Sequence, residues 1–242
     1  MRPGLIAILV LCVSAISAVA ADDRADERRR MVETIEAHAG SPEGGLAGGH
    51  IDAPVLEAMR AVPRHEFVPA EVSGQAYADR SLPIGLGQTV SQPYIVALMT
   101  HLLEVKPGDR ILEIGTGSGY QAAVLARLAG EVYSVEIVEE LARRAAQTLE
   151  RLGYTNITAR IGDGYQGWAE HAPYDGIVVT AAPDHVPPAL VAQLAVGARL
   201  VIPVGDADQE IRVITKTASG QREERLIPVR FVPLTRDVRE QD

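Results

Sequence analysis

The sequence predicts a doubly wound α/β fold, a mostly parallel sheet with helices on both faces, preceded by an N-terminal helical cap. Two observations indicate it. After Gln92, short apolar strands alternate with helical segments, and a glycine-rich turn joins the first of these strands to the next helix. Alternation of this kind predicts parallel strands, because a helix-length crossover must connect them, and its right-handedness leaves few topologies. The 242 residues, 47% of them apolar, suffice for such a domain.

Residues 1–20 are expected to be a signal peptide or an anchor. Met1-Arg2 gives a positive start, an apolar run extends from Leu5 to Val13, and Ala18-Val19-Ala20 matches a small-residue cleavage site. The competing interpretation is an uncleaved anchor, because the uncharged stretch from Pro3 to Ala21 has about the length that crosses a bilayer. Cleavage would leave no stable membrane span.

This segment bears on the compartment and on thiol chemistry. Cleavage would make the chain an exported, periplasmic protein, whereas a cytoplasmic chain is the alternative. The only cysteine is Cys12, so no internal disulfide can form. A mature chain without residues 1–20 would have no cysteine, which excludes cysteine catalysis.

Residues 21–50 are expected to form a helical lead-in and a glycine-rich linker. Met31, Val32 and Ile35 share one face of a charged helical segment. The stretch from Gly40 to Gly49 contains five glycines and a proline, which indicates a flexible connection.

Residues 51–242 are predicted to be the main domain, and its elements follow from local patterns. Pro54 and Pro93 suit the first turns of two helices, and the prolines between them indicate irregular structure. After Gln92 the chain alternates segments that predict strands with segments that predict helices. The predicted helices are 51–62, 93–103, 120–128, 138–152 and 188–194, and the strands are 110–114, 131–137, 157–161, 176–180, 199–204 and 211–217.

The turn from Gly115 to Gly119, with sequence G-T-G-S-G, joins a predicted strand to a helix. Its glycines allow the backbone to adopt positive φ and to approach a ligand closely. The spacing lacks the third glycine of the dinucleotide fingerprint G-x-G-x-x-G, and no G-K-[ST] follows, so a phosphate-binding P-loop is excluded.

Three successive strand ends each offer a carboxylate, from Glu113, Glu136 and Asp163. In such sheets ligands lie at the carboxyl ends of the strands. Glu136 follows Gly115 by 21 residues, where a carboxylate can accept from both ribose hydroxyls, and Asp163, next to Gly164, could accept from an exocyclic amine. The pattern predicts a nucleoside pocket without phosphate-binding chemistry.

Several other kinds of chemistry are disfavoured. Ser91 is predicted to cap the helix that begins at Pro93, and no G-x-S-x-G elbow surrounds it, so triad hydrolysis is not supported. The six histidines form no H-x-x-x-H pair, so we expect no metal site. The net charge of −9 argues against binding nucleic acid.

The glycine turn with its carboxylates resembles the class I S-adenosylmethionine-dependent methyltransferases, which have a Rossmann-like fold. Five segments in unbroken order are similar, more specifically, to the protein-L-isoaspartate O-methyltransferase family: 62–69, 87–94, 113–120, 162–165 and 230–235. The resemblance implies methyl transfer from S-adenosyl-L-methionine to the free carboxyl of L-isoaspartyl residues in damaged proteins and peptides, which starts repair through a methyl ester and a succinimide.

The resemblance also implies residue roles. Ser91 maps onto the family's active-site serine. The cofactor-binding residues would be Glu113, Gly115, Thr116, Gly117, Gly119, Glu136, Asp163 and Gly164, and those near the substrate would be Thr89, Val90, Tyr94 and Thr235. The partners would be isoaspartyl-containing peptides and proteins, with no nucleic acid, and we expect a monomer.

Two alternatives remain open from the sequence. One is a methyltransferase that acts on a small-molecule carboxylate or hydroxyl, and the other is a noncatalytic exported binding module. The family resemblance and the cytosolic origin of the cofactor favour a cytoplasmic chain, in conflict with residues 1–20.

Overall fold

The computed structural model describes residues 24–46 and 48–236. The expected signal peptide or anchor, and Cys12 within it, lie outside the described residues. Within the described part of the chain, no helix combines the length and apolar character needed to cross a membrane.

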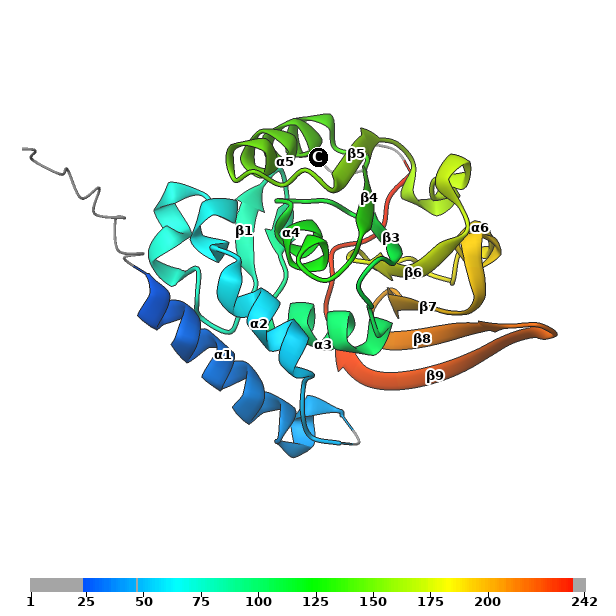
Figure 1. The fold of residues 1–242 in the computed structure, drawn as a ribbon, viewed down its shortest axis with the longest axis horizontal. Coiled ribbons are helices and arrows are strands. Elements are labelled where there is room, and N and C mark those ends of the chain that lie inside the picture. The colour runs from blue at the N-terminus through cyan, green and yellow to red at the C-terminus, as the bar shows by residue number, and fades with distance from the viewer. Residues whose placement is uncertain (1–23, 47, 237–242) are drawn as a thin grey trace, which may run out of the picture.

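A seven-stranded sheet forms the centre of the molecule, in the order β5-β4-β3-β6-β7-β8-β9 (Figure 1). The strands from β5 to β7 pair in parallel, whereas β8 and β9 are antiparallel to their neighbours. The predicted doubly wound, mostly parallel sheet is confirmed. The strands are β3 Arg110–Ile114, β4 Glu131–Glu136, β5 Ile157–Ile161, β6 Tyr174–Val179, β7 Leu194–Val204, β8 Gln209–Thr217 and β9 Gly220–Val229.

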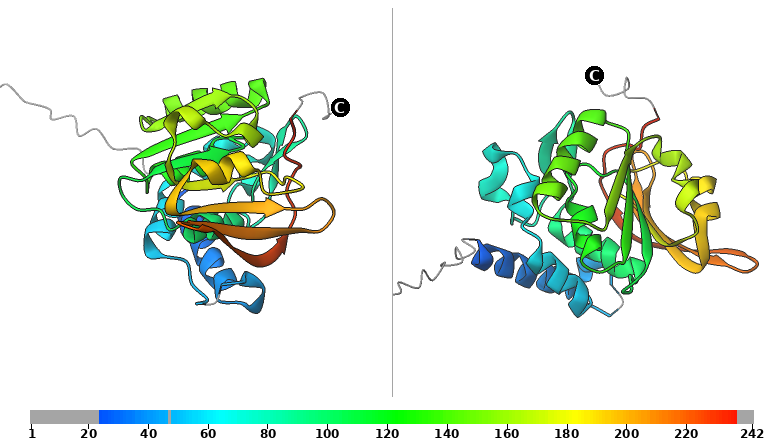
Figure 2. Two further views of the ribbon diagram at one scale, coloured as in Figure 1. Left: turned by 90° about the vertical axis from the view of Figure 1, so that its right-hand side faces the viewer. Right: turned by 45° about the horizontal axis from the view of Figure 1, so that its top comes forward.

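Helices cover both faces of this sheet. One core contains buried side chains of α1 to α5, and the other contains buried side chains of α6. Figure 2 shows helices on the two faces of the sheet. Successive strand residues enter opposite cores: Ile111 of β3 packs in the first and Leu112 in the second, as the alternation of side chains along a strand requires. The helices are α1 Ala25–Ala39, α2 Ala53–Ala61, α3 Pro93–Leu103, α4 Tyr120–Ala126, α5 Glu139–Arg151 and α6 Pro188–Gln193.

The sheet order creates a topological switch point between β3 and β6. From β3 the chain moves outward through β4 to β5, and then crosses back to place β6 on the other side of β3. In open α/β sheets, ligands bind in the crevice at the carboxyl ends of the strands at such a point. The ends of β3 and β6 therefore locate the candidate site.

Two strand pairings were not expected. Strands β1 Leu82–Gly85 and β2 Gln88–Val90 form a small hairpin in a stretch predicted to be irregular. Its tip has three consecutive left-handed residues, Gly85, Leu86 and Gly87, with φ of 89°, 53° and 69°. Strand β9 escaped prediction because its residues are largely exposed and carry no alternating apolar pattern; pairing with β8 defines it.

Within the glycine-rich segment before α2, which was expected to be a flexible connection, Gly44 and Gly45 lie close to other parts of the fold. Gly44 is buried and its carbonyl accepts a hydrogen bond from the Tyr94 hydroxyl. A Cβ on Gly45, which has φ +72°, would lie 2.0 Å from Ile227 Cγ2. Glycine is therefore required here by close packing as much as by backbone freedom.

Candidate active site

The glycine turn is fixed to the end of β6 by Thr180. The Thr180 N–H donates to the Ile114 carbonyl at 2.9 Å, and its hydroxyl donates to the Gly115 carbonyl at 2.6 Å. Gly115 has φ +95°, and a Cβ there would lie 2.5 Å from Thr180 Oγ1. Only glycine fits, so the turn leaves bare backbone at the switch point.

Glu136, at the end of β4, faces the same space. Its carboxylate accepts hydrogen bonds from the N–H groups of Gly117 at 2.8 Å and Val138 at 2.9 Å. The side chain is buried, and these two backbone donors fix its rotamer. The carboxylate is therefore held in position against the cavity, with lone pairs left for further donors.

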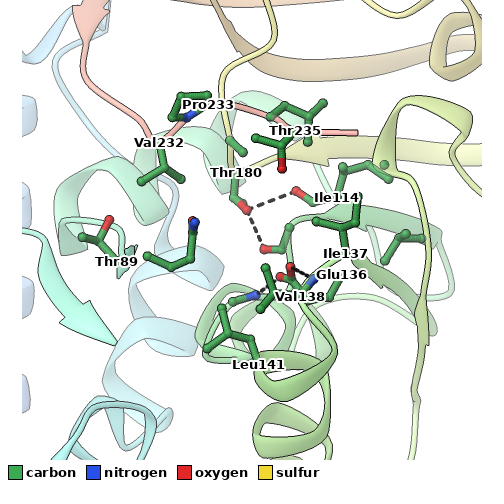
Figure 3. A pocket seen from close by; sticks show the side chains of 17 residues that line it. Thr89, Ile114, Glu136, Ile137, Val138, Leu141, Thr180, Val232, Pro233 and Thr235 are labelled. Carbon is green, nitrogen blue, oxygen red and sulfur yellow. Dashed lines mark hydrogen bonds between the residues drawn. The ribbon is translucent and has the colours of Figure 1, made fainter. Parts of the chain in front are cut away.

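These groups line a cavity that the close-up shows with Thr89 and Glu136 on opposite sides (Figure 3). Among its lining residues Glu136 is the only charged one. A phosphate group would need cations or a helix N-terminus, whereas an anionic wall with apolar neighbours suits a cationic nucleoside. The lining residues are Gln88, Thr89, Ile114, Gly115, Gly117, Val135, Glu136, Ile137, Val138, Leu141, Gly164, Thr180, Ala181, Val232, Pro233, Leu234 and Thr235.

The C-terminal segment 231–235 closes one side of the cavity. Ala182 donates its N–H to the Val232 carbonyl and accepts from the Leu234 N–H, both at 2.8 Å. The Gln209 carboxamide binds the backbone of Phe231 through both of its polar atoms. Thr235, expected near the site, lines the cavity.

A second hollow adjoins the first. It is lined by Ser81, Thr89, Ser91, Gln92, Ile95, Thr180 and residues 228–232. Thr89, Thr180 and Val232 line both hollows, so the two meet at these three residues. The Ser91 hydroxyl makes no hydrogen bond with any residue that the structure describes. It is therefore free to bind a ligand at this junction.

Buried Arg64 holds the backbone of Ser91. Its guanidinium donates to the Ser91 carbonyl at 2.6 Å and to the Ala76 carbonyl at 2.8 Å, and lies 4.5 Å from the centre of the Tyr120 ring. Burial lowers the pKa of Arg64 from its usual value. The cation connects the turn Arg64–Phe67 to the serine, a contact that the sequence did not indicate.

Ser91 does not cap α3, although this role was predicted. The helix N-cap is Gln92, which makes no side-chain capping bond. Instead the Asp79 carboxylate accepts from the Tyr94 N–H at 2.8 Å. The acceptor for this N–H at the start of the helix is thus 15 positions away in sequence. Local sequence patterns cannot reveal such a partner.

Three of the expected cofactor residues do not line the cavity: Glu113, at the end of β3, and Thr116 and Gly119, within the glycine turn. The Ser134 hydroxyl donates to Glu113 at 2.5 Å and is 2.5 Å from the Thr116 hydroxyl. Burial raises the pKa of Glu113 to about 8, and the charge of Glu136 acts in the same direction. This buried chain braces the turn from below.

Asp163, Val90 and Tyr94 are also not among the residues that line the cavity. The Asp163 carboxylate accepts from the Tyr165 N–H at 2.9 Å and caps a short 3₁₀ turn, while its neighbour Gly164 lines the cavity. Val90 is buried in the core. The Tyr94 ring is fully buried and stacks on His38 at 3.9 Å. Tyr94 is therefore a packing residue, because its hydroxyl is used by the Gly44 carbonyl.

Several lining residues were not singled out from the sequence, among them Gln88, Thr180 and Leu141. For Thr180 a signal existed: a polar residue directly follows an apolar strand. Among the described residues, no group of three or more metal-ligating side chains is present.

Comparisons with known proteins agree with this geometry. The family model for protein-L-isoaspartate(D-aspartate) O-methyltransferase matches residues 47–239. The protein-L-isoaspartate O-methyltransferase of Gloeobacter violaceus is 59% identical over 76% of this chain and 90% of its own length.

Two solved structures are similar to this chain. A protein-L-isoaspartate O-methyltransferase superposes with a TM-score of 0.75 at 28% identity, covering 86% of this chain and 66% of its own. A Plasmodium falciparum structure, described as the same enzyme in complex with S-adenosyl-L-homocysteine, has a TM-score of 0.73 at 26% identity and covers 87% and 99%. The chain belongs to the protein-L-isoaspartate(D-aspartate) O-methyltransferase family.

Proposed function

We propose that this chain transfers the methyl group of S-adenosyl-L-methionine to the free carboxyl of L-isoaspartyl residues in damaged proteins and peptides. The supporting observation is the junction of two hollows at Thr89, Thr180 and Val232. One hollow is lined by the glycine turn and Glu136, and suits a cationic nucleoside. The other is lined by Ser91 and suits a peptide. A methyl donor and an acceptor bound in them would meet at the shared wall.

The residues present fit the cofactor. When bound, it supplies a methyl group attached to a positively charged sulfur. Glu136 would accept from the ribose hydroxyls, and the bare backbone at Gly115 and Gly117 would allow close approach. Gly164 and Leu234 line the same cavity and would contact the nucleoside. A Cβ on Gly164 would lie 2.4 Å from Ile114 Cγ2, so packing against Ile114 requires glycine here.

The reaction does not require the chain to transfer a proton. A carboxyl with an ordinary pKa near ~4 is ionised at neutral pH, so no general base is needed. The chain's contribution is to align the carboxylate with the methyl group and to exclude water, which strengthens the attraction between the opposite charges. The Ser91 hydroxyl would donate a hydrogen bond to the substrate carboxylate or to the adjacent carbonyl. This bond would orient one carboxylate oxygen toward the methyl group.

Glu136→Gln is expected to weaken binding of S-adenosylmethionine about 30-fold, equivalent to about 2 kcal/mol, because a charge-assisted acceptor for the ribose is lost. The carboxamide would also turn a donor toward the Gly117 or Val138 N–H. Isothermal titration calorimetry measures the affinity, with the exposed Glu150→Gln on α5 as the matched control. Unchanged affinity in Glu136→Gln would exclude the ribose role.

Labelled methyl transfer tests the substrate. We expect incorporation into a peptide that contains L-isoaspartate and little into the same peptide with normal aspartate. Equal transfer to both, or transfer to small carboxylates or hydroxyl compounds alone, would favour a small-molecule methyltransferase. Absence of cofactor binding by calorimetry would favour a noncatalytic binding module.

The assembly and compartment are also proposals. A monomer remains the expectation, and the net charge of −9 supports the expectation that the chain binds no nucleic acid. Residues 1–20 support export to the periplasm, and the cofactor's cytosolic origin supports the cytoplasm. Cell fractionation with sequencing of the mature N-terminus separates the two.

A further inference from the structure

We propose that Gln92 is a specificity residue that presents its carboxamide oxygen to a backbone N–H of the peptide substrate, and that Asp79 is the positioning residue that sets this orientation. The inference rests on the proposed function, because it takes the hollow lined by Ser91 and Gln92 to be the peptide site. It adds a reason why a peptide, rather than a free carboxylic acid, would be preferred.

The orientation of the Gln92 side chain follows from its partner. Gln92 Nε2 donates to Asp79 Oδ2 at 2.9 Å. A carboxylate accepts hydrogen bonds and cannot donate them, so the opposite orientation would bring two acceptors together at this distance. The nitrogen therefore faces Asp79, and the oxygen is directed away from it.

Gln92 Oε1 has no hydrogen-bond partner among the residues that the structure describes. It is also absent from the buried polar atoms that lack a partner, so it is exposed to solvent. It is thus an accessible acceptor in a residue that lines the hollow. The neighbouring Ser91 hydroxyl is a free donor. Together they match an isoaspartyl peptide, which offers a carboxylate to a donor and flanking amide N–H groups to an acceptor.

Asp79 cannot easily reorient. Its Oδ1 accepts from the Tyr94 N–H at the start of α3, and its Oδ2 lies 3.1 Å from His38 Nδ1 of α1. The Asp79 side chain is only 13% exposed, and the His38 ring is itself held by stacking on Tyr94 at an interplanar angle of 12°. Groups from α1 and α3 therefore fix the carboxylate that orients Gln92.

Gln92→Ala tests the acceptor. We expect KM for an isoaspartyl peptide to rise about 5-fold, the size of one net hydrogen bond, with kcat within twofold and cofactor affinity unchanged. A series of ester peptides, each replacing one amide N–H near the isoaspartate by oxygen, identifies the donor. For the unmodified enzyme, one of these ester peptides should have a higher KM than the parent amide peptide. For Gln92→Ala, the same ester and the parent peptide should have equal KM values. The exposed Gln221→Ala on β9 is the matched control.

Asp79→Asn tests the positioning. The asparagine oxygen must still accept from the Tyr94 N–H, so its nitrogen would face Gln92 and turn that carboxamide around. The hollow would then contain a donor where an acceptor is needed. We expect KM to rise by about the same factor as in Gln92→Ala. KM of the double variant should be no higher than that of Gln92→Ala, because both substitutions remove the same hydrogen bond to the peptide.

The outcomes separate this inference from the proposed function. If the unmodified enzyme methylates isoaspartyl peptides but KM is unchanged in Gln92→Ala, or if every ester penalty persists in that variant, Gln92 does not contact the peptide and the inference is wrong. If the increases in KM of the two single variants add up in the double variant, Asp79 is not the residue that positions Gln92. If no isoaspartyl peptide is methylated at all, both the function and the inference are wrong.

Discussion

Ser91→Ala is expected to lower kcat for methyl transfer to an isoaspartyl peptide about 100-fold, the usual effect of removing one well-placed donor at a reacting group. Its hydroxyl lies in the hollow that joins the candidate cofactor cavity and has no partner among the described residues. Its backbone is held by Arg64 at 2.6 Å, so the substitution should not displace the segment. Single-turnover measurement with saturating cofactor reports the chemical step directly.

Cofactor affinity should be unchanged in this variant, because Ser91 lines only the second hollow. Ser81→Ala is the matched control: it removes a hydroxyl from an exposed position in the same hollow, and we expect a change in kcat of less than about threefold. If Ser91→Ala transfers methyl at the original rate while it binds cofactor normally, Ser91 has no part in the reaction.

Glu113→Gln is expected to abolish a loss of stability at high pH. Burial raises the pKa of Glu113 from its usual value of 4.5 to about 8 in the folded chain. Between these two values the unfolded chain loses a proton that the folded chain keeps, so the free energy of unfolding falls as pH rises through this range. A fully buried carboxyl shifted this far destabilises the fold at pH 9 by as much as about 5 kcal/mol.

Urea denaturation at pH 5.5 and at pH 9 measures the effect. A glutamine imitates the protonated carboxyl and can still accept from Ser134, so Glu113→Gln should resemble the original chain at pH 5.5 and be more stable at pH 9. The exposed Glu150→Gln should leave the pH dependence unaltered. If the free energy of unfolding of Glu113→Gln falls equally steeply between pH 5.5 and pH 9, other titratable groups cause the pH dependence.

Local patterns were sufficient for the parallel part of the sheet and for the glycine turn. Buried strands such as Arg110–Ile114 are rich in Ile and Leu, and Gly115, Gly117 and Glu136 belong to one strand-turn-helix-strand unit. Their spacing along the chain fixes their spacing in the fold, because a short turn leaves few conformations. The burial of Glu113 could not be predicted in this way, because it depends on the helices that pack against the face of β3 that also carries Ile111.

Contacts between distant segments escaped prediction. Arg64 and Ser91 are 27 residues apart, and His38 and Asp79 are 41 apart; no periodicity along the chain records such pairs. The exposed edge strand β9 escaped for a related reason, since backbone pairing with β8, and not a buried face, defines it.

The sequence by itself determined the fold class, the family resemblance and the positions at which a nucleoside pocket begins, because these depend on hydrophobic period and on glycines at a tight turn. Only the tertiary structure decided which candidate residues line the cavity, since that depends on how packing turns each side chain. It turned Glu136 toward the cavity and sealed Glu113 beneath the turn. It also joined Thr89, Thr180 and Val232 into one wall, because the ends of separate elements meet only when the sheet has formed.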